Sequence, residues 1–213
     1  MKGIYMELQE TLLSRRSVRK FADKEVEKEK ILRAIEVADL SPSAHNSRPW
    51  RFDVIYNKNL KNRIAEVHDG KLDKRLTNSV SFPNKLRVRL IMLMAKKVIT
   101  KSSLIIVAWN TRPLLNMLGG YKKGNHEKSD IAYQFVHDME IESISNSIYS
   151  IQLVLHSMGI GSVWMGISVL KEPEIKKILK SKDQLVSILA VGYPLYKSRE
   201  KKIRDKNLFV NIY

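Results

Sequence analysis

The strongest constraint on the fold is a long apolar repeat in the second half of the chain. Between about residues 138 and 158, large aliphatic side chains recur at alternating steps of three and four, which is the spacing of one helix face. The members of this stripe are Ile141, Ile144, Ile148, Ile151, Leu155 and Met158. The repeat predicts a long packing helix. Two interpretations stay open: the stripe packs on the core of its own domain, or the helix is buried on two sides in a dimer interface, which Leu153 and Val154 support.

Two continuous apolar runs predict buried strands beside this helix. Residues 104–109 are rich in β-branched side chains, and residues 185–191 lead into Gly192-Tyr193-Pro194. A shorter strand is expected over 52–56, and residues 114–125, with three glycines, read as a loop. Further helices are expected over 5–14, 27–40, 60–76 and 172–180. Strands that alternate irregularly with long helices indicate an α+β sheet covered by helices.

One more helix is expected to begin at Pro83, because proline is favoured in the first turn. Its apolar residues recur at helical spacing: Leu86, Leu90, Leu93, Met94 and Val98. Two interpretations of this helix remain open, a mobile lid or part of the core.

Length and composition place the chain among single-domain proteins. Its 213 residues are 44% hydrophobic, with no internal repeat and no Gly/Ser linker, so we expect one domain over residues 1–213. No apolar run approaches the length of a membrane span, and the first ten residues have no apolar signal core. The chain has no cysteine, which excludes disulfides and thiolate sites and fits a cytoplasmic location.

The net charge of +16 suits either a nucleic-acid-binding surface or a lysine-rich solvated one. The lysines are spread along the chain and interleaved with Asp and Glu. No helix-turn-helix, zinc-finger or aromatic RNA-binding pattern accompanies them, which disfavours a nucleic-acid partner. A basic surface would still steer anionic ligands inward.

Two segments near the start carry the clearest functional signal. Arg15-Arg16-Ser17-Val18-Arg19-Lys20-Phe21 concentrates guanidinium groups and a hydroxyl, which suits a phosphate. Ser41-Pro42-Ser43-Ala44-His45-Asn46-Ser47-Arg48-Pro49-Trp50 places small polar groups on a bent backbone. Within it, Asn46 and Arg48 could read the edge of a heterocyclic ring, whereas Trp50 is expected in the core. The two segments together are typical of a flavin site.

A third segment, Gly159-Ile160-Gly161-Ser162-Val163-Trp164-Met165-Gly166, does not fit a dinucleotide-binding fingerprint. That fingerprint needs a glycine where Trp164 stands, and it follows a strand, whereas here a long helix comes first. The sequence predicts a helix C-cap at Gly159 followed by a turn. Backbone amides beside the glycines could approach a flat ring closely and tune a flavin.

Taken in order, these motifs and the late Val191-Gly192-Tyr193-Pro194 resemble the FMN-dependent nitroreductase family over roughly the whole chain, least between residues 77 and 130. The resemblance implies a mainly antiparallel α+β fold in a domain-entwined homodimer, with FMN sites at the subunit interface. It also implies a ping-pong cycle, in which NAD(P)H delivers electrons and a nitroaromatic, quinone or similar flat acceptor takes them.

The resemblance also assigns roles to individual residues. Arg15, Arg16 and Ser17 would hold the phosphate and ribityl end of FMN, and Arg19 would lie near the pyrimidine edge, where its charge would stabilise the reduced flavin. The partner subunit would contribute its own copies of four residues of the second segment: Pro42, Ser43, Ala44 and Asn46. The remaining cofactor contacts would be Met165 and Gly166 beside the ring, Arg48, and a C-terminal cation, for which Arg199 is preferred.

Two departures from the family pattern leave questions open. Arg48 stands where many members have Gln, and several C-terminal cations compete with Arg199. His45 borders the expected cofactor loop and could contact substrate, whereas the histidines make no metal-ligand pattern. Reductive dehalogenation and flavin fragmentation are further activities of such proteins, without positive signs here. The alternatives of other classes are a flavin-binding protein without turnover and a basic module that binds nucleic acid or acidic partners.

Overall fold

The computed structural model describes residues 6–72, 81–117 and 131–196. Four antiparallel strands form one sheet in the order β1-β2-β4-β3. Their bounds are β1 Trp50–Ile55, β2 Leu104–Asn110, β3 Gly161–Met165 and β4 Gln184–Gly192. The two strands predicted from continuous apolar runs, β2 and β4, occupy the centre, which explains their composition: both of their faces are covered.

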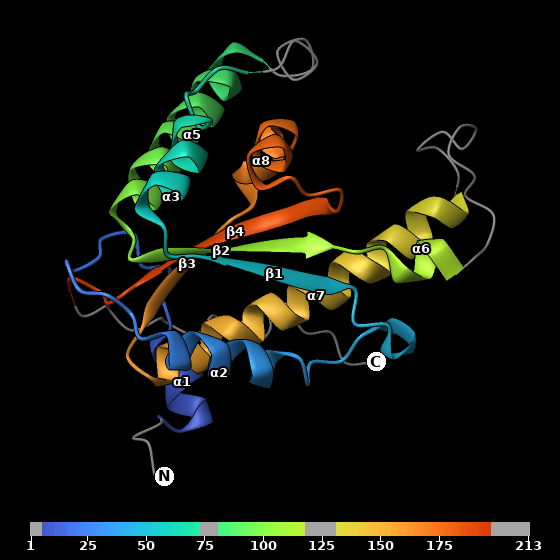
Figure 1. Ribbon diagram of the computed structural model, residues 1–213, viewed down its shortest axis with the longest axis horizontal. Coiled ribbons are helices and arrows are strands. Elements are labelled where there is room, and N and C mark those ends of the chain that lie inside the picture. The colour runs from blue at the N-terminus through green and yellow to red at the C-terminus, as the bar shows by residue number, and fades with distance from the viewer. Residues whose placement is uncertain (1–5, 73–80, 118–130, 197–213) are drawn as a thin grey trace, which may run out of the picture.

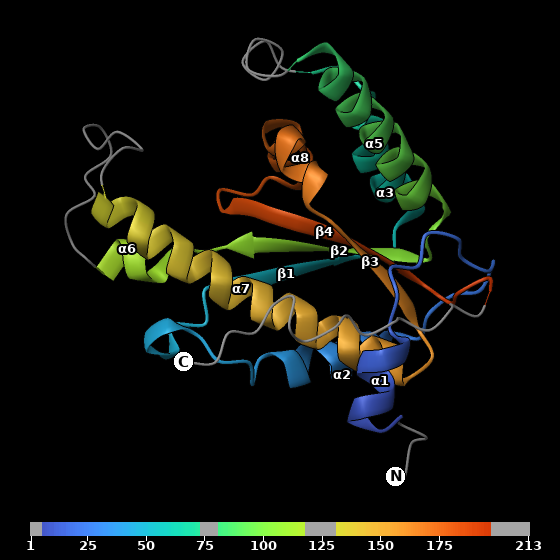
Figure 2. The same cartoon turned by 180° about the vertical axis from the view of Figure 1, so that it is seen from behind.

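Helices cover both faces of the sheet (Figures 1 and 2). The helices on one face are α3 Lys58–Glu66, α5 Phe82–Lys101 and α8 Glu172–Leu179. Those on the other side are α2 Lys28–Ala38 and α7 Ile131–Ser157, with α1 Leu8–Ser14 against α7. Successive residues of β2 alternate between the two cores, so that Ile105 and Val107 pack toward α3 and α5, whereas Leu104 and Ile106 pack toward α2 and α7. The predicted α+β architecture is confirmed.

The long helix α7 confirms the predicted stripe and extends seven residues further toward the N-terminus. Ile144, Ile148, Ile151 and Leu155 are fully buried against the sheet and α2. The own-domain interpretation is therefore confirmed for this stripe, while burial of a second side stays a prediction. The helix ends at the predicted C-cap, where Gly159 has a φ of +75° and the amide of the next residue donates to the Leu155 carbonyl at 2.9 Å.

Three expectations for secondary structure are wrong. Helix α3 ends at Glu66, not at residue 76, because Gly70 has a φ of +78° and the Asp69 carboxylate accepts from the Lys71 amide in a tight turn. The expected loop at 114–125 begins with a short helix, α6 Pro113–Met117, and residues 118–130 lie outside the described part. Residues 161–165 form β3, not a turn.

Helix α5 begins within one residue of the prediction, but of the predicted stripe it buries Val98 alone. Its buried residues are Met92, Ala95, Val98 and Ile99. Of the predicted stripe, Leu86, Leu90, Leu93 and Met94 are 41–53% exposed. The apolar periodicity of α5 therefore serves two surfaces, the core and an open face.

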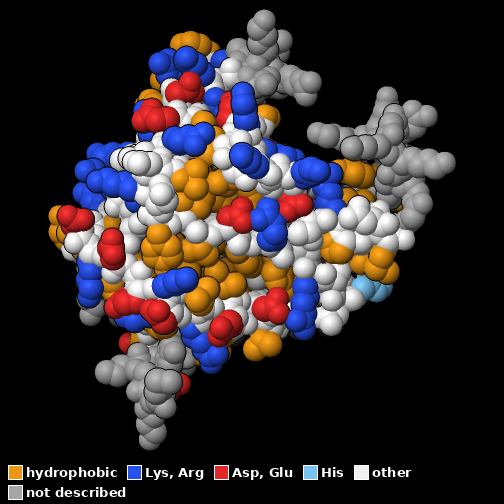
Figure 3. Space-filling view, viewed as in Figure 1, with side chains coloured by type: hydrophobic (Ala, Val, Ile, Leu, Met, Phe, Trp, Pro, Cys, Tyr) orange, Lys and Arg blue, Asp and Glu red, His pale blue; other side chains and the backbone are white. Residues whose placement is uncertain are grey.

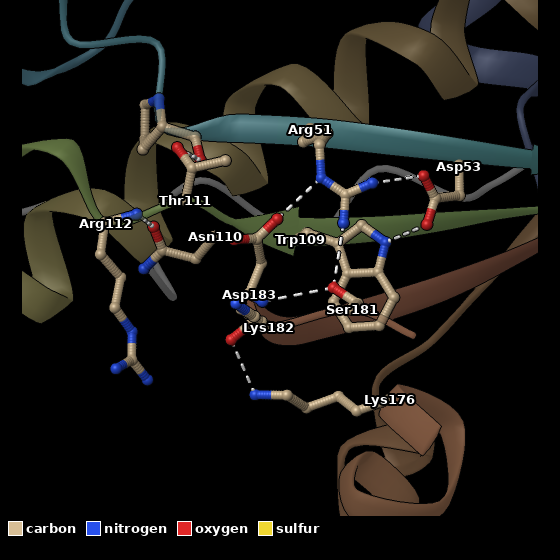
Figure 4. Close-up of polar contacts among 11 residues, drawn as sticks. Arg51, Asp53, Trp109, Asn110, Thr111, Arg112, Lys176, Ser181, Lys182 and Asp183 are labelled. Carbon is tan, nitrogen blue, oxygen red and sulfur yellow. Dashed lines mark hydrogen bonds and ion pairs between the residues drawn. The ribbon is translucent and has the colours of Figure 1, made fainter. Parts of the chain in front are cut away.

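A polar cluster around Arg51 ties β1 to β2 and to the turn before β4 (Figure 4). The Arg51 guanidinium donates to Asp183 at 2.7 Å, to Ser181 at 3.0 Å and to Asp53, and it lies over the Trp109 ring. The Trp109 indole in turn donates to Asp53 at 2.7 Å. Because each charged group has hydrogen-bond partners, we assign this cluster a structural role: it stabilises the packing of β1, β2 and the turn before β4.

Candidate active site

The basic segment that follows α1 is held against the β3 edge of the sheet. The Val18 amide donates to the Ser162 carbonyl at 3.0 Å, and Phe21 pairs with Pro194. Glycine is needed where these side chains land. A Cβ on Gly161 would lie 2.7–2.9 Å from the Val18 side chain, and a Cβ on Gly192 would lie 2.9 Å from the Phe21 ring. The apolar residues of the segment therefore anchor it, leaving its polar residues outward.

The start of this segment lies against α7. Arg15 is half-buried, with its guanidinium 5.7 Å from the centre of the Tyr149 ring. The Ser14 hydroxyl lies 2.9 Å from His156 Nε2, and the pKa of His156 is lowered by burial and then by the nearby Arg15 charge. Arg16 is half-buried, and Ser17 is exposed. This arrangement presents two guanidinium groups and a hydroxyl on a fixed backbone, as a phosphate site requires.

A cavity of about 290 Å³ begins at the end of this segment. Arg19 is exposed and is the charged residue of its lining, and its Nη1 lies 3.4 Å from the Ser17 carbonyl oxygen. Met165, the last residue of β3, and Gly166, which follows it, also line the cavity. A Cβ on Gly166 would meet nothing within 4 Å among the described residues, so the backbone there is open to a flat ligand. The structure thus brings three of the predicted residues together around one apolar cavity.

Four residues of α5 also line this cavity, and sequence reasoning assigned none of them to the site: Ala95 and Val98, which are buried, and Ile91 and Met94, which are exposed. Ile91 and Met94 are 49% and 53% exposed, which is unusual for residues of an apolar stripe that has a core available. The sequence signal that pointed to this helix was its apolar periodicity. That periodicity left two interpretations open, a lid or part of the core.

The second predicted segment forms a shallow pocket of about 200 Å³ on α7. Pro42, Ser43 and Ala44 line it together with four α7 residues: Met139, Glu142, Ser143 and Asn146. The Ala44 amide donates to the Ser143 hydroxyl at 3.1 Å, which fixes the loop on the helix. The four α7 residues were not predicted, because glutamate and asparagine on an exposed helix face look like ordinary surface.

The loop backbone after Ala44 is strained. His45, Asn46 and Arg48 all have a positive φ, between 43° and 52°. Such values are uncommon for residues other than glycine and cluster at functional sites. The Ser43 hydroxyl accepts from the Arg48 amide at 3.1 Å and supports this conformation.

Arg48 is engaged within its own chain. Its Nη1 donates to Asp39 at 2.8 Å and its Nε to the Asn46 side chain at 3.3 Å. Asp39 also accepts from the Trp50 indole at 2.8 Å, and Trp50 is buried, as expected, where it opens β1. Arg48 therefore braces the loop, and its predicted contact with the cofactor stays a prediction.

Within one chain the two predicted segments line separate pockets, but they approach each other along α7. The Ala44 amide donates to Ser143 and the Ser41 hydroxyl donates to Ser150. Arg15, in turn, lies over the ring of Tyr149. Figures 1 and 2 show the loop and α1 toward opposite ends of α7.

Arg199 lies outside the described residues. In the described part of the chain, no group of three or more metal-ligating side chains is found, and no helix is long and apolar enough to span a membrane.

Comparisons with known proteins agree on one family. The model described as "Nitroreductase family" matches residues 12–193. A protein of Methanothermobacter thermautotrophicus, whose provisional name is NADH dehydrogenase/NAD(P)H nitroreductase, is 27% identical over 194 residues, 89% of this chain and 78% of its own length. The crystal structure of a BluB-like flavoprotein from Clostridium difficile 630 superposes with a TM-score of 0.76 at 25% identity, covering 98% of this chain and 99% of that chain. The iodotyrosine deiodinase of Hydra vulgaris is 44% identical over 54 residues, 25% of this chain and 20% of its own length.

Proposed function

The chain belongs to the nitroreductase family, and on that premise we propose that it is a flavin-dependent oxidoreductase working by a ping-pong mechanism between NAD(P)H and a nitroaromatic, quinone or similar flat acceptor. The observation that carries the proposal is the apolar cavity that joins Arg19 to Met165 and Gly166. It offers a largely apolar space with one cation in its lining, which suits a flavin ring.

The residues of the chain fit FMN in charge and shape. The open backbone at Gly166 admits a ring, and the exposed Ser17 with the half-buried Arg15 and Arg16, which precede Arg19 in the chain, supply groups suited to the ribityl and phosphate ends. FMN, when bound, supplies the two-electron redox chemistry, accepting from NAD(P)H in one half-reaction and giving to the acceptor in the next.

The protein's own contribution is binding, orientation and electrostatics. Arg19 holds a permanent positive charge at the cavity, which stabilises negative charge that develops on a reduced ring. Ile91 and Met94 of α5 line the cavity and present an apolar wall to a flat acceptor. No titratable side chain is required to move a proton in this scheme.

The separation of the two pockets supports a homodimer with shared sites. The cavity at Arg19 measures about 290 Å³, the pocket at Ser43 measures about 200 Å³, and they share no lining residue. Because the two lie apart in one chain, the loop of a partner would complete the cavity. A monomer by light scattering that retains FMN would refute this part of the proposal.

The test of function is an anaerobic visible spectrum of the purified protein with FMN, before and after NADH and then NADPH. Bleaching of the flavin band, followed by recovery when a nitroaromatic, a quinone or an iodophenol is added, supports turnover and ranks the acceptors. A yellow protein that neither donor bleaches would instead be a flavin-binding protein. Protein that takes up no FMN and carries nucleic-acid absorbance would favour the basic binding module.

A variant experiment tests the phosphate site. Arg15→Ala combined with Ser17→Ala should weaken FMN binding at least tenfold, because it removes charge-assisted contacts. Arg33→Ala is the matched control, since it removes an exposed arginine of α2 that pairs with Glu36 at 3.6 Å. Unchanged FMN affinity in the double variant would refute the assignment.

Arg19 is tested by potentiometry. Arg19→Gln should lower the flavin reduction potential more than it lowers FMN occupancy, and Arg19→Lys should restore much of the potential because it keeps the charge. Equal potentials in all three proteins would contradict the placement of Arg19 beside the ring.

A further inference from the structure

A polar cavity of about 570 Å³ lies between the first turn of α3, the C-terminal end of α5 and residues 21–25. Four lysines line it, contributed by three separate segments: Lys24, Lys58, Lys61 and Lys101. Asp23 and Glu25 also line it, and both are exposed. Figure 3 shows basic side chains crowded over α3 and α5 at the left of the view. This cavity shares no lining residue with the cavity that contains Arg19.

Lys61 is the unusual member of this set, because it is only 5% exposed. Its ammonium donates to the backbone carbonyls of Ser102 and Ser103, the second at 3.3 Å, just past the end of α5. Both partners are neutral, and in the described part of the chain no carboxylate lies within ion-pair distance of Lys61. An ammonium has three donors, so one remains for a ligand.

A buried charge without a counter-ion is costly, and proteins usually pair it. The pKa of Lys61 is lowered, first by burial and then by the positive charge of Lys58. The two ammonium groups therefore repel each other across the first turn of α3. An anion seated between them would relieve both costs. The start of α3 favours negative charge, and Lys61 covers carbonyls at the end of α5 that would otherwise repel it.

We propose that this cavity binds a small phosphorylated molecule, with its phosphate held by Lys58, Lys61 and Lys101. A lysine ammonium binds phosphate as a point charge. It lacks the planar guanidinium with which arginine forms paired hydrogen bonds to a carboxylate. The volume falls within the usual range for small-molecule sites, about 300–1,000 Å³. Asp23 and Glu25 at the rim interrupt the positive surface, which disfavours a long polyanion such as nucleic acid and favours a compact ligand.

Calorimetric titration of pyrophosphate and of inorganic phosphate tests the proposal at constant ionic strength. If the protein binds FMN, it is saturated with FMN beforehand, so that the flavin phosphate site is already occupied. Wild-type protein should show saturable binding, and Lys58→Gln and Lys61→Met should each weaken it at least tenfold. Lys177→Gln, which removes an exposed lysine of α8, is the matched control and should bind as the wild type does.

Lys101→Gln keeps the test decisive if Lys61→Met fails to fold, because Lys58 and Lys101 are both exposed and their removal leaves the core intact. Pyrophosphate should also raise the melting temperature of the wild type, and should raise it less in Lys58→Gln. Absence of saturable binding would overturn the proposal and leave Lys61 as a cap of α5. Equal losses in Lys177→Gln would show general charge attraction and would overturn it as well. The outcome does not depend on whether the protein turns over NAD(P)H.

Discussion

Gly161→Ala tests how the sheet edge holds the basic segment. The added Cβ would lie 2.7, 2.8 and 2.9 Å from three side-chain atoms of Val18, whereas ordinary contact begins at 3.4 Å. Val18 is buried and β-branched, so it cannot turn away and must retreat by several tenths of an ångström. Overpacking of this kind costs about 1–3 kcal/mol. Stretching the 3.0 Å bond from the Val18 amide to Ser162 adds about 1 kcal/mol.

We therefore expect Gly161→Ala to lower the free energy of unfolding by about 2–4 kcal/mol, measured by urea denaturation. FMN affinity should fall with it, because the displaced segment includes Ser17 and Arg19. Gly166→Ala is the matched control: nothing lies within 4 Å of its added Cβ, and its stability should stay within about 0.5 kcal/mol of the wild type.

The double variant Gly161→Ala/Val18→Ala separates crowding from other causes. Removing the two Val18 methyl groups opens the space that the new Cβ needs, so the two changes should be less damaging together than the sum of their single effects. If Gly161→Ala is as stable as Gly166→Ala, or if the double variant is simply additive, the argument from close packing is refuted.

Two further predictions concern stability. Arg51→Met should lower the free energy of unfolding, measured by urea denaturation, by about 1–3 kcal/mol because it leaves Asp53 and Asp183 without their cation. Arg33→Met, at an exposed ion pair, should lower it by at most about 0.5 kcal/mol. Equal effects would mean that the Arg51 cluster does not stabilise the sheet. Burial lowers the pKa of His68 below its usual 6.5. Below about pH 6.5 the unfolded chain therefore protonates His68 more readily than the folded chain does. The contribution of neutral His68 to the free energy of unfolding is complete above about pH 6.5 and is lost as the pH falls below it. The loss of stability between about pH 7 and about pH 5 should be smaller in His68→Gln, and an unchanged pH profile would count against this reasoning.

The elements that could be predicted from sequence are those whose pattern arises from one dominant contact surface. The stripe of α7 and the apolar runs of β2 and β4 each face an extensive core, so periodicity alone identified them. Strand β3 was missed because its glycine suggested a turn. Gly161 in fact makes room for Val18, a residue far away in sequence, and no local pattern reports such a contact.

The same distinction holds for the candidate site. The residues Arg15, Ser17, Arg19 and Ser43 could be named from local motifs because charge and turn chemistry are legible in short segments. Met94 could not be assigned, because an exposed apolar residue on a helix looks like a core residue until the fold shows which face is open. The first helical turns of α7 were not predicted for a related reason. Ile131 and Phe135 are 82% and 64% exposed, so they do not extend the buried stripe.

Helix α7 has a consequence for how the protein tolerates length changes. Its 27 residues span about 40 Å, and along them it carries both the loop at Ser43 and the end of the basic segment. A single residue inserted between Ser143 and Tyr149 would turn everything beyond it by about 100° and advance it by about 1.5 Å. The two half-sites would then no longer share an orientation, and the loop, which is bonded to both Ser143 and Ser150, would itself be pulled apart. The residue count of α7 between these contacts is therefore constrained.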